Sequence, residues 1–342
     1  MFMSQQTQGS GAPPAVEVLQ LARGYWLSRA VYVAAQLGIA DLVKDGAKSA
    51  SELAAATQTD PGALYRLLRA LASVGVFAES GERRFVQTPL SETLRRDTSG
   101  SIRGMVLFLG DHLHWSIYEH LLYSVRTGKR AFDHVLGQAP FEYLSQHPED
   151  ARVFDEGMTS LSSTSSAAVA EAYDFSSFRT VMDLGGGNGA LLAAILGKYP
   201  NLRGILFDSE HVIERARQAA VLNPGQCEMV HGDFFRNIPS GADAYLFKHV
   251  IHDWDDEHAL KILQNCRRAI SDSGKLLITE MIVPPGNDPA FVKLLDLEML
   301  MIPGGLERTE EEFRRLLAAA SFRLTRVVST KVDISVLEAV PV

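Results

Sequence analysis

The sequence predicts an α/β protein, in which a doubly wound and mostly parallel sheet follows a mainly helical N-terminal region. After residue 178, short runs of β-branched and apolar residues alternate with helical stretches, which is typical of parallel sheets. The first of these runs, 180–184, leads directly into a glycine-rich turn at 185–189. Between residues 50 and 88, two short helices precede a small hairpin, a pattern typical of a winged helix.

Length and composition narrow the class of protein further. The 342 residues leave room for about two domains, and 33 Lys and Arg against 41 Asp and Glu give a formal charge of −8. A chain this acidic does not attract nucleic acid through its overall field. No apolar run reaches the roughly 18 residues of a membrane span and the start does not resemble a signal peptide, so we expect no membrane contact. With only two cysteines, a reduced cytoplasmic setting is expected.

The helical N-terminal region is expected to begin after a polar start. Residues 1–15 are rich in Gln, Ser, Gly and Pro and are predicted to be disordered. Apolar residues then recur at helical spacing over 16–37, and Gly38 ends that predicted helix. Asp60 is placed to cap a later helix, with Pro61 at its first position.

A hairpin around Gly81 completes the predicted winged helix, which we assign to residues 16–98. Residues 99–342 form the second predicted domain, in which several helices lead into the sheet. Seven strands are expected there, at 180–184, 203–208, 227–231, 243–248, 275–283, 322–328 and 334–340. Only a short turn separates the last two strands, which predicts an antiparallel hairpin at one end of the sheet.

The turn after the first strand is the strongest local signal for a ligand. It reads DLGGGNG at 183–189, and glycines there let a ligand approach the backbone closely. The same pattern also fits a dinucleotide loop. Asp183 argues against that ligand, because a carboxylate beside the loop would repel a pyrophosphate. A cationic nucleoside without phosphate, such as S-adenosylmethionine, suits this acid better.

Two further acids follow the next two strands. Asp208 ends the second strand, where a carboxylate is placed to accept the ribose hydroxyls of a bound nucleoside. Asp233 follows the third strand, and its neighbour Phe234 offers a ring face to an adenine. Each acid alone would also suit a helix cap. Because the carboxyl ends of parallel strands share one edge of the sheet, we expect these acids to face one ligand there.

A cluster of histidines and acids follows the fourth strand, in FKHVIHDWDDEH at 247–258. His252 and Asp253 lie past the end of that strand and before the next helix. The cluster lacks the spacing of a known metal motif, and Asp253, Asp255 and Asp256 are well placed as helix caps. We therefore expect no metal site. His249 has no assigned role at this point.

Six motifs, in order along the chain, resemble those of the plant-type small-molecule O-methyltransferases. That family includes caffeic acid and hydroxyindole methyltransferases and bacterial members from antibiotic pathways. The motifs are DLGGGNG at 183–189, FDSEHVIE at 207–214, GDFF at 232–235, FKHVIHDWDDEH at 247–258, ITEMIVP at 278–284 and PGGLERTEEEF at 303–313. The resemblance extends to the winged helix and implies a Rossmann-like class I methyltransferase domain behind an N-terminal dimerisation domain. It also implies S-adenosylmethionine as cofactor, S-adenosylhomocysteine as its product, and no metal.

The resemblance implies roles for individual residues. The positions expected to bind the cofactor are Asp183, Gly185, Gly187, Asp208, Asp233, Phe234, Lys248 and Ser162. His252 matches the catalytic base, Glu280 and Glu307 match the two acids that flank it, and Asp253 is grouped with them. Phe154, Met158 and Met299 match positions that line the substrate pocket, and Trp115 and Ile302 are expected to line it as further apolar residues. These five side chains are apolar, which suits a flat aromatic acceptor.

The chemistry of these residues is consistent with methyl transfer to a phenol. A phenol has a pKa near 10, so little of it is ionised at neutral pH, and a histidine with a pKa of about 6.5 can take its proton. Such a base accelerates a reaction roughly 10²–10⁴-fold. A carboxylate on the other ring nitrogen would orient the ring, and Glu280, at the end of the fifth strand, is placed to face His252.

The leading hypothesis is an S-adenosylmethionine-dependent O-methyltransferase that acts on a phenolic or aromatic hydroxyl of a small molecule. One alternative keeps the fold and cofactor but methylates nitrogen, or does not methylate. Another is a winged-helix regulator that senses the cofactor. Residues 1–100 hold ten Lys and Arg against nine acids, which is a poor footprint for DNA. We instead expect a homodimer formed through the N-terminal domain, in which the apolar helix at 16–37 is buried.

Overall fold

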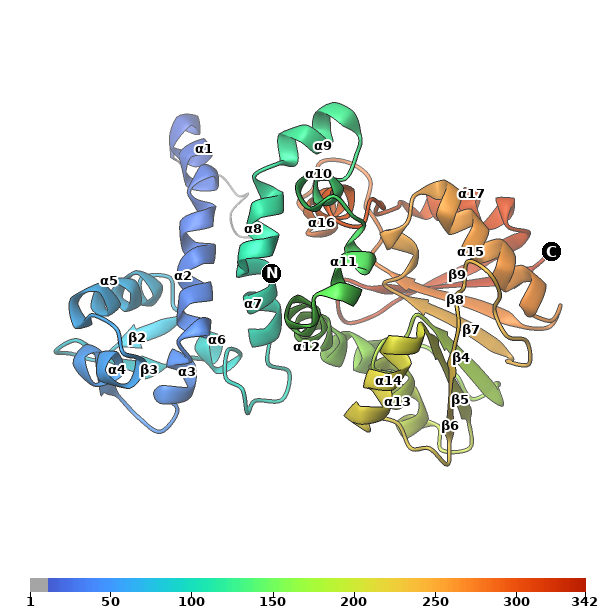
Figure 1. Cartoon of the computed structure of the whole chain (residues 1–342), viewed down its shortest axis with the longest axis horizontal. Coiled ribbons are helices and arrows are strands. Elements are labelled where there is room, and N and C mark those ends of the chain that lie inside the picture. The colour runs from blue at the N-terminus through green and yellow to red at the C-terminus, as the bar shows by residue number, and fades with distance from the viewer. Residues whose placement is uncertain (1–11) are drawn as a thin grey trace. The chain divides into compact units, whose positions relative to one another are not determined.

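The computed structural model describes residues 12–342, so most of the segment predicted to be disordered, 1–15, lies outside the described residues. The described chain forms two compact units, which we call the N-terminal unit and the sheet unit (Figure 1). The N-terminal unit comprises residues 12–116 and 147–161, and the sheet unit comprises 117–146 and 162–342. Helix α12 (Pro148–Ala172) contributes to both units.

The N-terminal unit begins with two helices where the sequence predicted one. α1 (Pro14–Ala22) starts inside the segment expected to be disordered, because proline suits the first turn of a helix. The chain interrupts the helix at Arg23 and continues as α2 (Gly24–Gln36), and the poor helix propensity of Gly24 favours a break there. Gly38 ends the helical run as predicted, in the left-handed conformation with φ of 65°.

The predicted winged helix is present in the N-terminal unit. After α3 (Ile39–Leu42), it consists of β1 (Lys48–Ser49), α4 (Ala50–Thr57), α5 (Pro61–Ala72), β2 (Phe77–Glu79) and β3 (Arg84–Gln87), with the strands in the order β1-β3-β2. The side chain of Asp60 accepts the backbone N–H of Ala63 at 2.7 Å, which confirms the predicted cap. The predicted hairpin is the antiparallel pair of β2 and β3.

Short helices connect the winged helix to the sheet. They are α6 (Pro89–Glu92), α7 (Arg103–Gly110), α8 (His112–Tyr118), α9 (Leu121–Thr127), α10 (Ala131–Leu136) and α11 (Pro140–Gln146). The chain ends α9 at Gly128 and α10 at Gly137, both with positive φ, and begins α12 at Pro148. Among residues 12–342, no helix is both long enough and apolar enough to cross a bilayer.

The sheet unit is built on a seven-stranded sheet with the order β6-β5-β4-β7-β8-β10-β9. Its strands are β4 (Thr180–Leu184), β5 (Arg203–Asp208), β6 (Cys227–His231), β7 (Ala244–Lys248), β8 (Lys275–Glu280), β9 (Phe322–Ser329) and β10 (Ser335–Pro341). β4 to β8 are parallel, and β10 pairs antiparallel with both β8 and β9, which confirms the predicted terminal hairpin.

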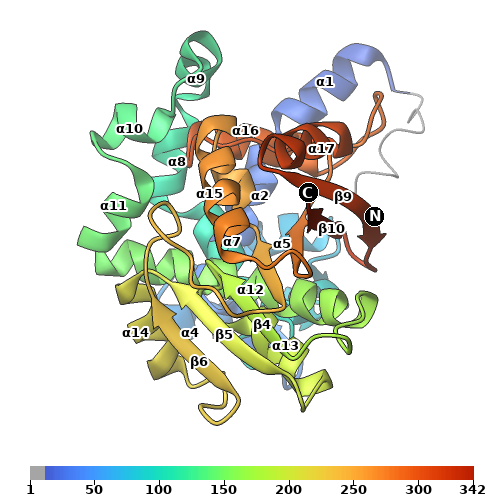
Figure 2. The ribbon, with the colours of Figure 1, turned by 90° about the vertical axis from the view of Figure 1, so that its right-hand side faces the viewer.

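Helices cover both faces of this sheet, because successive side chains of a buried strand point to opposite faces. One face carries α15 (Asp256–Ala269) and α17 (Glu310–Ala319), and the other carries α13 (Ala190–Lys198) and α14 (Glu210–Ala219) (Figure 2). In β7, Tyr245 and Phe247 belong to the hydrophobic cluster of the first face, whereas Leu246 belongs to that of the second. The remaining elements are α16 (Val292–Met301) and the short 3₁₀ helix η1 (Ile251–Asp253). Burial on both faces holds the strands in place, so the residues at their carboxyl ends are presented from a rigid edge.

Candidate active site

Four of the predicted site residues lie at the carboxyl ends of four parallel strands. Asp183 is in β4, Asp208 ends β5, Lys248 ends β7 and Glu280 ends β8. These strands pair in parallel, so their carboxyl ends lie along one edge of the sheet. Open α/β sheets bind ligands at this edge. These four residues therefore lie along one edge of the sheet.

Asp183 is buried beneath the glycine loop, with 1% of its surface exposed. Neither of its carboxylate oxygens has a hydrogen-bond partner within the described part of the chain. Burial raises the pKa of Asp183 to about 7, which the charge of Lys248 opposes. A side chain on Gly186 would lie 2.6 Å from an Asp183 oxygen, so only glycine fits at that point of the loop. A buried acid without a partner at a ligand-binding edge is suited to a cationic ligand.

Asp208 is held in place by the backbone of the loops around it. Its two oxygens accept the N–H groups of Gly187 at 3.0 Å and of Ser209 at 2.7 Å. Burial nevertheless raises the pKa of its carboxyl. Since a carboxylate has about four lone-pair sites, both oxygens can still accept a hydroxyl from a ligand.

Lys248 places a buried cation at this edge. Its Nζ donates to the hydroxyl of Ser162 at 3.0 Å, which joins the end of β7 to α12. Burial lowers the pKa of Lys248 to about 8, although Asp183 and Glu280 oppose that shift. The structure thus brings together Lys248 and Ser162, the two cofactor positions that rested on resemblance alone.

Asp233 and Phe234 lie in the loop after β6. A side chain on Gly185 would approach the Phe234 ring at 3.6 Å, so the aromatic ring borders the glycine loop. Asp233 is about half exposed, and it accepts the backbone N–H of Phe235 at 2.8 Å. The Phe234 carbonyl accepts from Asn265 at 2.8 Å, which anchors the loop on α15.

Glu280 holds the short helix that carries the predicted base. One of its oxygens accepts the backbone N–H groups of Val250 and Ile251, both at 3.1 Å. Its other oxygen lies 3.5 Å from Nδ1 of His252. Burial alone would raise the pKa of Glu280, but the charge of His252 and hydrogen bonds lower it. Glu280 therefore positions the backbone of η1 as an ionised group.

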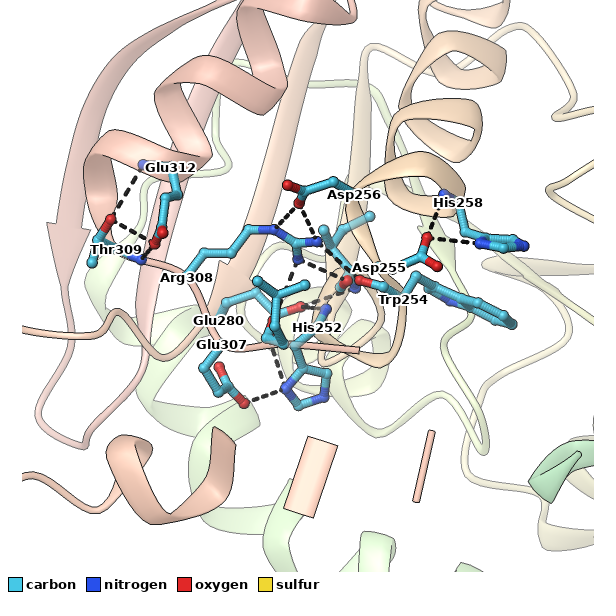
Figure 3. A network of polar contacts seen from close by, with 12 residues as sticks. His252, Trp254, Asp255, Asp256, His258, Glu280, Glu307, Arg308, Thr309 and Glu312 are labelled. Carbon is cyan, nitrogen blue, oxygen red and sulfur yellow. Dashed lines mark hydrogen bonds and ion pairs between the residues drawn. The ribbon is translucent and has the colours of Figure 1, made fainter. Parts of the chain in front are cut away.

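Glu307, rather than Glu280, makes the direct hydrogen bond to the imidazole of His252 (Figure 3). Nδ1 of His252 lies 2.7 Å from Oε1 of Glu307, and an ionised carboxylate can only accept, so Nδ1 carries the hydrogen. Nε2 is then the nitrogen that can take a proton. Glu307 is itself fixed, because its backbone N–H donates to Asp296 at 2.8 Å.

The acids around His252 make its imidazole a strong base. Burial by itself would lower the pKa of His252, but the carboxylates of Glu280, Asp253 and Glu307 raise it to about 10. Asp253 faces the other side of the ring, with its Oδ1 3.7 Å from Nε2. Burial raises the pKa of Asp253 to about 7. The imidazolium form of His252 is thus strongly stabilised at this edge.

His249 also contacts Glu280, a contact that the sequence did not indicate. Its Nδ1 lies 3.5 Å from the Glu280 oxygen that faces His252. The two imidazole rings are 5.2 Å apart between centroids. His249 adopts a left-handed backbone conformation with φ of 51°, which is uncommon for a residue other than glycine.

Sequence reasoning missed Arg308, although it lies within a motif that the sequence analysis used. Arg308 is 1% exposed, and its guanidinium donates to the carbonyls of Ile251 at 3.1 Å and Trp254 at 2.9 Å (Figure 3). The same group binds Asp256 at 2.9 Å. No sequence signal could have revealed this, because backbone carbonyls more than 50 residues away accept the bonds.

The predicted substrate residues are divided between the two units. Met299 and Ile302 lie at the end of α16 in the sheet unit. Trp115, Phe154 and Met158 belong to the N-terminal unit, where Trp115 lies beside the guanidinium of Arg29 at 4.9 Å and Phe154 lies edge-on to Phe108. The substrate roles of all five remain predictions.

Two family models match the chain. The O-methyltransferase dimerisation domain matches residues 19–97, and the O-methyltransferase domain matches residues 118–323. Three curated relatives cover nearly the whole length. A phenazine O-methyltransferase of Lysobacter antibioticus is 43% identical and aligns over 99% of this chain and 100% of its own. A mitomycin biosynthesis 6-O-methyltransferase of Streptomyces lavendulae is 38% identical and aligns over 94% of this chain and 93% of its own. A phenazine-1-carboxylate N-methyltransferase of Pseudomonas aeruginosa is 32% identical and aligns over 96% of this chain and 98% of its own.

Solved structures resemble the fold equally well. The crystal structure of LaPhzM matches with a TM-score of 0.91 at 44% identity and covers 97% of this chain and 100% of its own. Human N-acetylserotonin methyltransferase, solved in complex with S-adenosylmethionine, matches with a TM-score of 0.90 at 26% identity, over 98% and 99% of the two chains. Both matches span the N-terminal unit and the sheet unit.

Proposed function

Since the chain belongs to the O-methyltransferase family, we propose that it methylates a phenolic or aromatic hydroxyl of a small molecule, with His252 as the general base. Enzymes of this family, including this one, use S-adenosylmethionine as methyl donor. The observation that carries the proposal is the buried His252–Glu307 pair, which leaves Nε2 as the proton acceptor at the ligand-binding edge of the sheet.

The residues at this edge fit S-adenosylmethionine. The buried carboxylate of Asp183, which has no partner among the described residues, suits a cation, and Asp208 can accept hydroxyls. Lys248 suits the carboxylate of the cofactor, and Phe234 offers an apolar ring face. When bound, the cofactor supplies a methyl group on a sulfonium, which leaves as a neutral thioether.

His252 handles the proton of the acceptor. The acids keep most of His252 as imidazolium at neutral pH, so its neutral form is the base. A phenol and this imidazolium both have a pKa near 10, so the neutral imidazole takes the proton of the phenol with little change in free energy. The carboxylates of Glu280 and Glu307 stabilise the state with imidazolium and phenolate, and the phenolate is the nucleophile. Glu307 fixes the Nδ1–H, so the proton that leaves the phenol oxygen goes to Nε2.

The alternative of nitrogen methylation is supported by one relative named as an N-methyltransferase. An aromatic amine is already nucleophilic without loss of a proton, whereas a hydroxyl needs a base. Three carboxylates raise the pKa of His252, and this favours a hydroxyl acceptor. A panel of acceptors decides between them. With S-adenosylmethionine labelled in the methyl group, we expect label on phenols, including hydroxylated phenazines and catechols. Label on amines alone would support the alternative, and label on no acceptor together with tight binding to duplex DNA would overturn the proposal.

We further propose that the chain forms a homodimer through its N-terminal unit. The helices α1 and α2 expose large apolar side chains, which a monomer rarely does over a contiguous area. These are Val18, Leu19, Leu21, Tyr25, Trp26 and Leu27, with exposed fractions between 43% and 74%. The match to a dimerisation domain over residues 19–97 covers most of them.

The affinity for S-adenosylmethionine is expected to depend on pH through Asp183. Its pKa is raised to about 7, so the carboxyl is mostly ionised at pH 8 and mostly protonated at pH 6. Since only the ionised form attracts a cation, the Kd for S-adenosylmethionine should rise roughly tenfold when the pH is lowered from 8 to 6. Isothermal titration calorimetry with the Asp183→Asn variant separates this effect from the titration of other groups. An equal pH dependence in both proteins would contradict the role of Asp183.

A further inference from the structure

Three buried donor atoms converge beside the proposed base. They are Nδ1 of His249, Nδ1 of His252 and Oε2 of Glu280, and all lie within 4.8 Å of one another. The Glu280 oxygen is 3.5 Å from each of the two nitrogens. The sequence predicted that Glu280 faces His252 but assigned no role to His249, so the group of three was not predicted. Ligand atoms about 2.0–2.2 Å from one tetrahedral ion lie about 3.4 Å apart, so the two distances from Glu280 suit a shared metal ion, and a small rotation of the imidazole rings would complete the site.

Two of these atoms lack the partners that buried polar atoms normally have. In the described structure, Nδ1 of His249 and Oε2 of Glu280 are both buried, and the geometry of their 3.5 Å contact with each other does not make a hydrogen bond. Glu307 binds His252 through Oε1, and its other oxygen, Oε2, is also buried without a hydrogen bond in the described structure. A buried polar atom without a partner costs about 1–3 kcal/mol. A ligand that bound these atoms would recover that cost.

The charge of the group selects a divalent cation. Glu280 is fully buried and Glu307 is 4% exposed, so two carboxylates share a site with little solvent. A divalent ion would neutralise both, whereas a monovalent ion would neutralise one. Imidazole nitrogens combined with carboxylates favour Zn²⁺, Co²⁺, Ni²⁺ or Cu²⁺ over Mg²⁺ and Ca²⁺, which prefer oxygen ligands.

We propose that His249, His252 and Glu280 form an inhibitory binding site for a divalent transition-metal ion. The ion displaces the proton on Nδ1 of His252, which is released to the buffer. Glu307 then loses its hydrogen bond and is free to serve as a fourth ligand. A neutral imidazole bound through Nδ1 keeps its hydrogen on Nε2. Nε2 can then no longer accept a proton from the acceptor, so the bound ion blocks methyl transfer.

Metal binding is tested directly with Co²⁺, because its visible absorption changes in intensity when protein ligands replace water. The intact protein is titrated without cofactor, beside His249→Asn and His258→Asn. Asparagine is chosen because it tolerates the left-handed backbone at position 249. His258 is the matched control, since its Nδ1 lies 2.7 Å from Asp255 in an exposed histidine–carboxylate pair.

We expect one Co²⁺ per chain in the wild type and in His258→Asn, and an affinity at least roughly 100-fold lower in His249→Asn, because loss of a partner of a metal ligand already costs about 10–100-fold. Thermal unfolding of each variant verifies that it is folded. Equal Co²⁺ affinity in a folded His249→Asn variant, or the absence of saturable binding in the wild type, would overturn the proposal.

Inhibition is measured separately, as the Zn²⁺ concentration that halves the methyl-transfer rate of each protein relative to its own rate without metal. This concentration should rise by the same factor in His249→Asn and stay constant in His258→Asn, and a chelator should restore activity. Saturable Co²⁺ binding without inhibition by Zn²⁺ would show that the ion leaves the base free, and would overturn the inhibitory role. The Co²⁺ measurement does not depend on the proposed function, so the two proposals can fail independently.

Discussion

Replacement of His252 by alanine is expected to lower kcat roughly 10²–10⁴-fold, which is the usual contribution of a general base. The imidazole is the group at this edge whose Nε2 is placed to accept a proton, since Nδ1 is bound to Glu307. The Kd for S-adenosylmethionine should change little, because Asp183, Asp208 and Lys248 carry the proposed cofactor contacts. Steady-state kinetics and calorimetry on the same preparation measure both quantities.

The matched control is His258→Ala, which removes a histidine that also pairs with a carboxylate but is about half exposed. It should keep nearly the wild-type kcat. Acceptors of graded acidity make the test sharper, because a phenol that is already ionised needs no base. The loss caused by His252→Ala should therefore shrink as the pKa of the acceptor falls. A loss that is independent of acceptor pKa, or a collapse of cofactor binding, would show that His252 has another role.

The second large effect is expected for Arg308→Met, which keeps the length of the side chain but removes its donors. Arg308 joins the loop that carries Glu307 to the turn that carries His252, through the carbonyls of Ile251 and Trp254 (Figure 3). These carbonyls would lose a charged donor that is itself buried. Asp256 is 75% exposed and stays solvated, so the loss comes from the two carbonyls. We expect the free energy of unfolding to fall by about 1–3 kcal/mol for each carbonyl left without its donor, as measured by urea denaturation.

Arg308 also acts as a positioning residue for the base, so kcat should fall in Arg308→Met under conditions where the variant stays folded, while the Kd of S-adenosylmethionine is kept. Arg308→Lys should recover part of kcat, because one ammonium can serve some of the same acceptors. Arg314→Met is the control, since Arg314 pairs with Glu310 on the exposed face of α17, where an ion pair contributes about 0.3–0.5 kcal/mol. An unchanged kcat in folded Arg308→Met would restrict Arg308 to a structural role.

Much of the fold follows from local patterns. Asp60 and Pro61 mark the start of α5 because the side chain of one and the ring of the other suit the first turn of a helix. The terminal hairpin follows from the short turn between two strands. The prediction of one long helix at 16–37 was wrong in one respect, since the helix is interrupted at Arg23. Apolar spacing continues through that break, so periodicity alone does not reveal it.

The sequence was sufficient to predict which site residues lie at the ends of the parallel strands. Asp183, Asp208, Lys248 and Glu280 each end a parallel strand or lie close to its end, and topology alone then brings them to one edge. Which acid binds the imidazole was not predictable in the same way. Glu280 was expected to face His252, and it does at 3.5 Å, but the hydrogen bond is made by Glu307.

The sequence by itself determined the α/β order of elements, the glycine loop and the set of acids, because these depend on residue type and on spacing along the chain. The tertiary structure decided how the acids divide their tasks. Gly305 lets its loop pass against the carbonyl of His252, where a side chain would overlap the backbone, and this close approach brings Glu307 to Nδ1 and Arg308 to the turn. Contacts of this kind join residues more than 50 positions apart, so they arise only when packing fixes the paths of both loops.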